Sequence, residues 1–418
     1  MGFQSGLSGL NASAKNIDII GNNDANANTV GFKSSRAIFA DVFASSLAGG
    51  GAGNVGIGVK VAQVQQEFTQ GNITVTNSPL DLAINGRGFF RFDSNGSAAY
   101  SRNGQMHLDG SGYIVNSDGL RLTGYTVDSK NNIVTSSPVP LRLATADIDP
   151  SSTTEMAGTL NLDSRSTLIT AAFNPTNVST YTSSTSSAVY DSLGNAHALT
   201  MYFVKTATPG QWDMHATVDG GPVSAVDLGA VAPPGSGFGV PRTLNFNSSG
   251  TLTTPQPMTG VQLNVAGGAV SPLAMQMDFT GTSQFGADFG VTTLSQNGYT
   301  SGRLTGFDVS DNGLISGRYT NGQANTLGQV VLGNFANPQG LRSMGDNLWQ
   351  ETAESGGPVI GSPQTGSLGS LQSASVEDSN VDLTQELVSM ITAQRAYQAN
   401  AQTIKTQDQV LQTIVNLR

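Results

Sequence analysis

The chain has 418 residues, a length that allows two to four domains. Charged residues make up only 11% of it and 51 residues are glycine, which favours turn-rich β structure over long helices. The formal net charge of -10 argues against a basic surface of the kind that binds nucleic acid. Because the chain has no cysteine, structural disulfides and thiolate metal sites are excluded.

The first segment is predicted to form a helix from residue 3 to about residue 28. Its apolar residues recur at alternating spacings of four and three, which places them in one stripe: Phe3, Leu7, Leu10, Ala14 and Ile17. A lone helix cannot bury such a stripe, so a partner helix is expected. Polar residues interrupt the apolar ones, so we expect no cleaved secretory signal at this end.

Residues 31–71 and 366–377 are expected to connect the ends of the chain to a β domain. The first of these segments holds a glycine-rich stretch that cannot form a packed helix, made of Gly49, Gly50, Gly51, Gly53, Gly56 and Gly58. We interpret it as a flexible loop between two extended arms. Its composition fits both a passive surface loop and a contact that lets neighbouring molecules slide.

Six Asn-Gly pairs, beginning at residues 85, 95, 103, 297, 312 and 321, predict hairpins with type I′ turns. Three pairs lie on each side of a long gap, which indicates one β domain formed by residues 72–145 and 293–365. A second domain, residues 146–292, is then inserted into it. Alternating apolar residues in this insert, as in the run from Leu199 to Val204, predict half-buried strands and an all-β structure.

The last segment repeats the pattern of the first over a longer helix. Spacings of four and three join Leu383, Leu387, Met390, Gln394, Tyr397, Ala401, Ile404, Asp408, Leu411 and Val415. Residues 1–30 and 378–418 are therefore expected to form a helical coiled-coil domain, within one molecule or between copies. The predicted fold class is mainly β with α-helical termini and two nested, discontinuous β domains. No apolar run is long enough for a transmembrane helix, so no membrane insertion is expected.

Catalysis is not expected from this sequence. The histidines His107, His197 and His215 do not have a metal-binding spacing, and the chain lacks both a phosphate-binding loop and a Gly-x-Ser-x-Gly motif. Adjacent acidic residues such as Glu377 and Asp378 are expected to lie in a solvated loop. We therefore expect a protein that is no enzyme and has no cofactor, metal site or catalytic residue.

Both ends of the chain resemble the signatures of the bacterial flagellar rod and hook proteins, a family of axial proteins. At the N-terminal end, the residues that carry the resemblance are Asn26, Asn28, Thr29, Gly31, Phe32 and Lys33. At the C-terminal end, within residues 381–400, they include Arg395, Tyr397 and Asn400. Residues 80–90 are similar to the strand that opens the first β domain of this family. The large insert and residues 187–203 and 304–341 resemble the hook members more than the shorter rod proteins.

The resemblance implies a structural subunit that self-assembles into a short, curved, flexible tube and transmits torque from the rod to the filament. The terminal helices would line the tube, and the inserted domain would lie outside. Implied partners are further copies of the chain, the rod protein, the hook cap, the hook-filament junction protein and the flagellar type III export apparatus. The implied location is extracellular. The alternatives are a distal rod protein and a non-flagellar extracellular polymer or adhesin.

Overall fold

The structure is a computed structural model that describes residues 2–42, 58–94, 96–128, 131–143, 147–230, 235 and 237–416. Within these residues most of the regular structure is β, with an α-helix near each end of the chain. The predicted class, mainly β with helical termini, is confirmed. The chain forms two compact units: unit 1 comprises Met1–Thr145, Gly306–Arg318 and Ala324–Arg418, and unit 2 comprises Ala146–Thr305 and Tyr319–Gln323.

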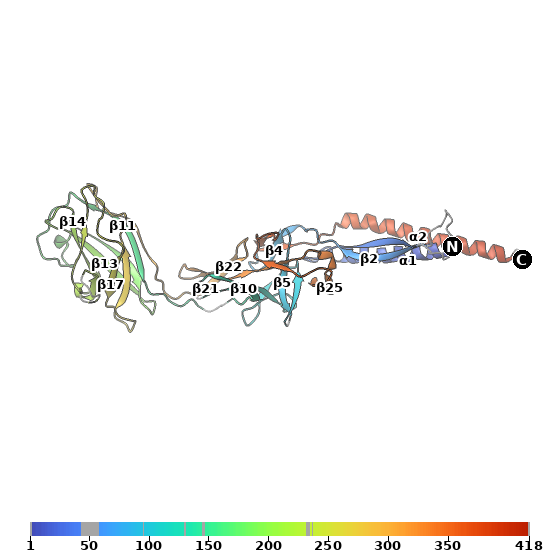
Figure 1. Ribbon diagram of the computed structural model, residues 1–418, viewed down its shortest axis with the longest axis horizontal. Coiled ribbons are helices and arrows are strands. Elements are labelled where there is room, and N and C mark those ends of the chain that lie inside the picture. Colours follow the sequence, from blue (N-terminus) through green and yellow to red (C-terminus); the bar gives the residue numbers. More distant parts are fainter. Residues whose placement is uncertain are drawn as a thin grey trace. The chain divides into compact units, whose positions relative to one another are not determined.

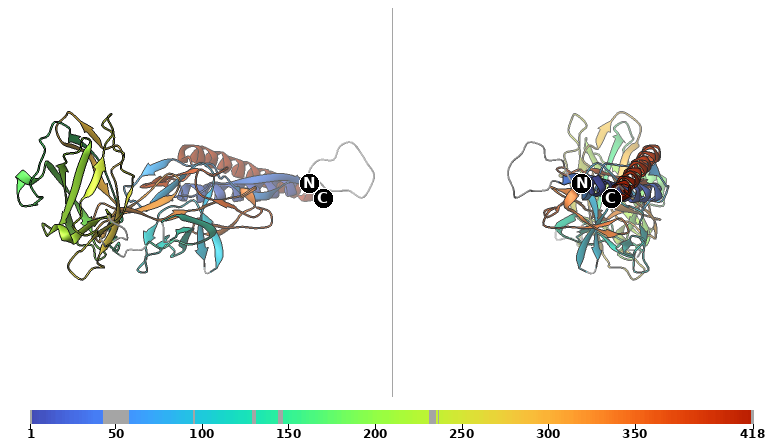
Figure 2. Two further views of the ribbon diagram at one scale, coloured as in Figure 1. Left: turned by 60° about the vertical axis from the view of Figure 1, so that its left-hand side comes forward. Right: turned by 90° about the vertical axis from the view of Figure 1, so that its right-hand side faces the viewer.

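The two helices of unit 1 lie side by side and run antiparallel (Figures 1 and 2). Helix α1 spans Gly2–Ala25 and helix α2 spans Leu383–Asn416. The start of α2 is capped by Asp382, whose carboxylate accepts hydrogen bonds from the backbone N–H groups of Thr384 and Gln385. Helix α1 ends three residues earlier than predicted, where Asn26 begins a series of tight turns.

A two-stranded ribbon packs beside α1, and short strand pairs link it to the main sheet. The ribbon consists of β1 (Ser35–Val42) and β2 (Gly58–Gln66). The short pairs are β3 (Ile73–Val75) with β29 (Ser375–Glu377), and β4 (Leu82–Asn85) with β28 (Ser370–Ser373). Residues 366–377 are therefore more than the connecting segment that was predicted, because Leu368 and Leu371 are buried in the β core.

The main sheet of unit 1 has 13 strands among the described residues. Its central path runs β21-β22-β23-β9-β5-β6-β26-β25, and a buried core that includes Phe90, Phe92 and Leu122 packs against it. Its strands are β5 (Phe89–Ser94), β6 (Ser97–Ser101), β7 (His107–Leu108), β8 (Ile114–Val115), β9 (Arg121–Val127), β10 (Ile133–Pro140), β21 (Leu304–Val309), β22 (Leu314–Tyr319), β23 (Ala324–Val330), β24 (Leu332–Asn334), β25 (Arg342–Gly345), β26 (Leu348–Gln350) and β27 (Val359–Gly361).

Unit 2 is built from two sheets that share one apolar core. Leu199, Met201 and Phe203 alternate inward on β13, as the sequence pattern predicts, and pack with Trp212. One sheet contains β11 (Glu155–Asp163), β15 (Val226–Leu228), β17 (Met258–Leu263), β18 (Leu273–Asp278), β19 (Ser283–Phe285) and β20 (Gly290–Gln296). The other contains β12 (Ser183–Tyr190), β13 (Ala196–Lys205), β14 (Gln211–Val218) and β16 (Arg242–Asn245).

The predicted end of the inserted domain, at residue 292, is wrong. It falls inside β20, which pairs with β11 of unit 2. The chain stays in this unit until Thr305, and the short segment Tyr319–Gln323 belongs to it as well. The sequence reasoning placed the boundary at an Asn-Gly pair, but the side chain of Asn297 accepts hydrogen bonds from the backbone of Thr154 and Glu155 and closes the unit.

The predicted type I′ turns are also wrong at every described Asn-Gly pair, because none of these asparagines has a positive φ. At Gly313 and Gly322 only the glycine is left-handed, with φ of 81° and 79°, and it ends a three-residue hairpin loop. At Gly104 the reason for glycine is close approach, since an added Cβ would lie 1.6 Å from the carbonyl oxygen of Leu82. A pair of adjacent left-handed residues does occur between β25 and β26, at Asp346 and Asn347.

Candidate assembly surface and its junction

The contact between α1 and α2 is made by small residues. Ala12 and Ala393 are buried, and Cβ atoms added at Gly6 and Gly9 would lie 3.1 Å from Ile404 and 2.8 Å from the Asn400 side chain. Small side chains let the two backbones approach closely. The sequence reasoning missed this stripe because it followed the spacing of four and three from Phe3 to Ile17, which leaves out Gly6, Gly9 and Ala12. The stripe could have been predicted from Gly6, Gly9 and Ala12, which are small residues spaced by three along the helix.

The predicted apolar stripe lies largely outside this contact. On α1, Phe3 and Leu7 are 46% and 44% exposed, whereas Leu10, Ala14 and Ile17 are half-buried. On α2 the exposed members of the stripe are Leu383, Leu387, Gln394, Tyr397, Asp408 and Leu411, and the half-buried ones are Met390, Ala401 and Ile404. The side chain of Val415 lies outside the described residues. A coiled coil with these residues at its centre is therefore not formed within one chain.

Helix geometry explains where each residue of the α2 stripe lies. A heptad repeat drifts by about 20° per heptad around a straight α-helix. Leu383 therefore faces outward, whereas Ile404, three heptads later, has turned toward α1 and contacts Gly6. Leu411 continues this turn, but α2 extends past the start of α1 at this point, so Leu411 is 54% exposed (Figure 1).

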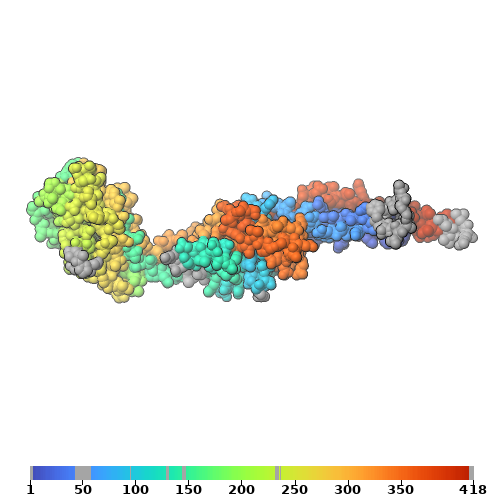
Figure 3. Space-filling view, viewed as in Figure 1, coloured from blue at the N-terminus to red at the C-terminus, as the bar shows by residue number. Residues whose placement is uncertain are grey.

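Near its start, α2 presents a compact outward surface that we call the outer ridge. It consists of Leu383, Leu387, Val388 and Ile391, which are 43%, 50%, 56% and 51% exposed. Residues three and four apart are neighbours on a helix, so these four side chains form one patch. In the space-filling view of Figure 3 the red atoms of α2 lie at the surface of the molecule. An uncovered apolar patch of this kind marks an interaction surface.

A second surface feature is a groove between α1, α2 and the β1–β2 ribbon, which we call the helical groove. Its volume is about 490 Å³. It is lined by Ser5, Gly9, Ala12, Ser13, Asn16, Phe39, Gly58, Val59, Ala393, Ala396 and Asn400. None of these residues is charged, and most of them are small. The groove could therefore receive apolar side chains without burying an unpaired charge.

The junction beneath the helices is held by a buried group of three charged residues, the charge triad. The ammonium group of Lys33 lies 2.6 Å from Oε1 of Glu377, and Nη1 of Arg102 lies 3.0 Å from Oε2 of the same carboxylate. The side chains of Lys33 and Glu377 are fully buried, and that of Arg102 is 5% exposed. Glu377 therefore does not lie in a solvated loop as predicted, because β29 brings it beneath the two helices, where both cations reach it.

Backbone groups complete the triad. Lys33 donates to the carbonyl of Thr69, Arg102 donates to the carbonyl of Gly86, and the Glu377 carboxylate accepts from the N–H of Gly71. Burial lowers the pKa of Lys33 and of Arg102, while the charge of Glu377 acts in the opposite direction. Because residues 33, 102 and 377 come from three distant segments, the triad ties both ends of the chain to the β sheet.

The N-terminal motif residues surround this junction. Asn26 and Thr29 hydrogen-bond to each other in the turn after α1, and Phe32 is half-buried, whereas Asn28 is exposed. Gly31 has a φ of 70°, and its N–H donates to the carbonyl of Glu377. In the C-terminal motif, Asn400 contacts α1 by donating a hydrogen bond to Ser13, while Arg395 and Tyr397 point outward.

Of the predicted flexible loop, only Gly58 lies within the described residues; Gly49, Gly50, Gly51, Gly53 and Gly56 lie outside them. Gly58 begins β2 and pairs with Val42. A Cβ added at Gly58 would lie 2.0 Å from the hydroxyl of Ser8 on α1. This glycine therefore belongs to the packed ribbon and not to a free loop, and a close approach to α1 explains the residue type.

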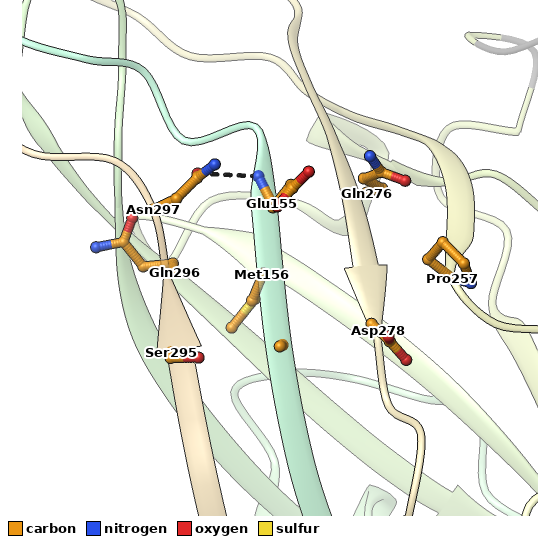
Figure 4. Close-up of a pocket in the computed structure, with 9 residues that line it drawn as sticks. Glu155, Met156, Pro257, Gln276, Asp278, Ser295, Gln296 and Asn297 are labelled. Carbon is orange, nitrogen blue, oxygen red and sulfur yellow. Dashed lines mark hydrogen bonds between the residues drawn. The ribbon is translucent and has the colours of Figure 1, made fainter. Parts of the chain in front are cut away.

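Unit 2 carries a hollow lined mainly by polar side chains (Figure 4). Strands β11 and β18 bring Glu155, Gln276 and Asp278 to it, and Asn297 accepts a hydrogen bond from the Glu155 N–H. These are two separate carboxylates among amide groups, with no histidine, serine-base pair or cation in the lining. Among the described residues, no group of three or more acidic or histidine side chains is placed to hold a metal ion.

Among the described residues, neither helix is both long enough and apolar enough to cross a membrane.

In unit 2, His197 forms ion pairs with the buried Asp191 and with Asp219, whose side chain is 51% exposed. Its ring nitrogens lie 2.7 Å from Asp219 and 3.2 Å from Asp191. Burial lowers the pKa of His197, but the hydrogen bonds to Asp219 and Asp191 outweigh it and hold the pKa above 6.5. The stability that this charge contributes is complete below the unfolded-state pKa of about 6.5 and is lost as the pH rises through the folded-state pKa.

We expect the urea midpoint of unit 2, followed by the fluorescence of buried Trp212 in a Trp349→Phe background, to fall as the pH rises through this window. His215 acts in the opposite direction, because burial lowers its pKa. The wild-type curve should therefore be compared with that of His197→Gln, and the difference isolates His197. A difference that does not change with pH would contradict the assignment.

Comparison with known proteins places these features in a class. Family models match four stretches of the chain: "Flagella basal body rod protein" over residues 3–33, "Flagellar hook protein FlgE/F/G D1 domain" over 83–156, "Flagellar basal body protein FlaE D2 domain" over 161–299, and "Flagellar basal body rod FlgEFG protein C-terminal" over 372–417. The class is therefore that of the flagellar axial proteins, and both helices and both units contain matched stretches.

Full-length relatives identify the family. The chain is 43% identical to the flagellar hook protein FlgE of Escherichia coli K12 and 32% identical to that of Borreliella burgdorferi, over 98% or more of each chain. It is also similar to the crystal structure of Helicobacter pylori flagellar hook protein FlgE2, at 14% identity and a TM-score of 0.49, over 72% of this chain and 99% of that one. The chain belongs to the flagellar hook protein family and is a structural subunit of the hook, an extracellular part of the flagellum.

Proposed function

We propose that the exposed apolar residues of α1 and α2 drive the assembly of identical subunits into the tube of the hook. The observation that carries this proposal is the outer ridge, an apolar patch that the chain itself leaves uncovered in a family whose members build a polymer. The remaining stripe residues, from Phe3 and Leu7 to Leu411, would add contacts along the same helices.

In this proposal residues 1–30 and 378–418 form the inner tube, and unit 2 lies on its outside. The charge of the helical ends supports this arrangement. Residues 382–418 contain three acidic and three basic residues, and the exposed surface of α2 is rich in glutamine. Neutral helices avoid the repulsion that stacked copies of a charged helix would suffer. The subunit would act mechanically, without catalysis or a cofactor.

We infer the individual binding partners of the subunit from the position of the hook between the rod and the filament. The assembled chain would contact the rod protein at its base and the hook-filament junction protein at its tip, with the hook cap present during growth. It would leave the cell unfolded through the flagellar type III export apparatus, without cleavage of a signal. The polar character of residues 2–18 supports the last point, since they contain no continuous apolar segment.

Replacing Leu387 with aspartate should weaken assembly and leave the folded subunit intact. An exposed side chain contributes little to folding, so the urea midpoint should be nearly unchanged. Burial of one leucine in an interface is worth about 1.5–3 kcal/mol. The critical concentration for tube formation, measured by sedimentation and electron microscopy, should therefore rise by roughly tenfold to a hundredfold.

Leu168→Asp provides the matched control, because Leu168 is 49% exposed and Leu387 is 50% exposed, but Leu168 lies in unit 2. It should leave the critical concentration close to the wild-type value. Equal effects of the two substitutions would show that lost solubility or general surface charge, and not the outer ridge, governs assembly.

A further inference from the structure

The outer ridge and the helical groove are complementary surfaces of the same chain. We propose that the helical groove of one subunit receives the outer ridge of a second copy. This inference rests on the proposed function and deepens it, because it states which surface of the neighbour covers the ridge. The ridge is formed by four aliphatic side chains, and the groove is lined by small, uncharged residues.

The position of the two surfaces on α2 explains why a second copy is needed. At 100° per residue, Leu387 and Ile391 lie about half a turn around the helix from Ala393 and Ala396, which line the groove. A rigid helix cannot place both faces in one contact. The ridge of a subunit therefore cannot enter its own groove, and the ridge is available to a neighbour.

Because the ridge and the groove are separate surfaces of one chain, their contact predicts an assembly of more than two copies. A contact between two different surfaces of identical chains leaves a free ridge on one copy and a free groove on the other. Each added copy repeats the contact, so the assembly does not close as a two-fold dimer, and it grows as a helical array when the rotation per copy does not close a ring. This property agrees with the family of the chain, whose members form the flagellar hook.

The chemistry of the groove suits an aliphatic ridge. The small side chains of Ala12, Ser13 and Ala396 leave room for the branched side chains of Leu387, Val388 and Ile391. The lining also includes the amide group of Asn16, which can make a polar contact. Neither surface contains a charged residue, so the contact buries apolar area without the cost of desolvating an ion.

The absence of cysteine makes the contact directly testable, because introduced thiols have no competitor. A chain carrying Ser13→Cys in the groove would be mixed with a chain carrying Val388→Cys on the ridge, assembled into tubes and oxidised. A disulfide requires Cα atoms roughly 4.4–6.8 Å apart, so a linked heterodimer reports direct contact. Ala396→Cys with Leu387→Cys provides a second pair should either first variant assemble poorly.

The expected result is a heterodimer in assembled tubes that is lost in dilute monomer. It should also be lost when Leu168→Cys, an equally exposed position of unit 2, replaces the ridge cysteine. Tubes without heterodimers from either pair would overturn the inference, as would tubes that yield only ridge-to-ridge homodimers. Failure of the wild-type chain to form tubes would overturn the proposed function together with this inference.

Discussion

Glu377→Gln is expected to destabilise unit 1 by about 3–5 kcal/mol, the cost of breaking a buried ion pair by removing one partner. The substitution keeps the shape of the side chain but removes the negative charge. Lys33 and Arg102 would then be left as two buried cations without a counter-charge. Urea unfolding should be followed by the fluorescence of Trp349 in a Trp212→Phe background, because Trp349 lies in unit 1 and Trp212 lies in unit 2.

The matched control is Glu67→Gln, the same substitution at an exposed ion pair. Glu67 lies 3.4 Å from Arg36, and their side chains are 40% and 66% exposed. An exposed pair contributes less than about 1 kcal/mol, so the urea midpoint should barely move. Equal effects of the two substitutions would contradict the role assigned to burial.

A second comparison separates the charge from the packing of the triad. Replacing all three members by apolar residues of similar length, as Lys33→Met, Arg102→Met and Glu377→Leu, removes every buried charge. Such replacements are often neutral or stabilising, so the triple variant should recover much of the stability lost in Glu377→Gln. The carbonyls of Thr69 and Gly86 lose their donors in this variant, so recovery should be incomplete.

The charge triad joins both terminal helices to the β sheet of unit 1, which matters for a protein of the hook. Lys33 follows α1, Glu377 precedes α2, and Arg102 belongs to the β region of unit 1. A torque that passes between the helices and the sheet must cross this junction. Asn23 and Asn380 strengthen this junction. Asn23 donates to the carbonyl of Ser35 and to the carboxylate of Glu386. Asn380 accepts from the N–H of Ser34, just before β1, and donates to the carbonyl of Glu67, just after β2.

The sequence predicted the elements of this junction but not its chemistry. Lys33 was selected because it belongs to a terminal motif, and nothing in its neighbours indicates a buried cation. Glu377 was assigned to a solvated loop because adjacent acidic residues are usually exposed. Lys33 and Glu377 are 344 residues apart in the sequence, and the pairing of β29 with β3 brings their side chains together. Long-range charge pairs of this kind leave no local periodicity to detect.

The helices illustrate the opposite case. Their existence and their apolar stripes follow from a local period and were predicted, but the face that each stripe presents was not. Whether Leu383 or Ile404 contacts α1 depends on a drift of about 20° per heptad and on where α1 begins and ends. The small residues Gly6 and Gly9 decide how closely the helices approach, and they lie outside the spacing that defines the predicted stripe.

Gly31→Ala is expected to have the next largest effect, because two independent costs add at this position. A left-handed backbone costs a residue with a Cβ about 1–2 kcal/mol, and Gly31 has a φ of 70°. The new Cβ would also lie 2.5 Å from the backbone nitrogen of Asn103, which cannot move as a side chain can. Overpacking adds about 1–3 kcal/mol, so the total loss of stability should be about 2–5 kcal/mol.

Two further glycines of unit 1 separate these costs. Gly119 has a φ of 77° but no atom within 4 Å of an added Cβ, so Gly119→Ala should show the backbone cost alone. Gly110 has neither a left-handed φ nor a nearby atom, so Gly110→Ala should be nearly neutral. Measured by Trp349 fluorescence in urea, the losses should rank Gly31, then Gly119, then Gly110. If Gly31→Ala lost no more than Gly119→Ala, the contact with Asn103 would not be what requires glycine after α1.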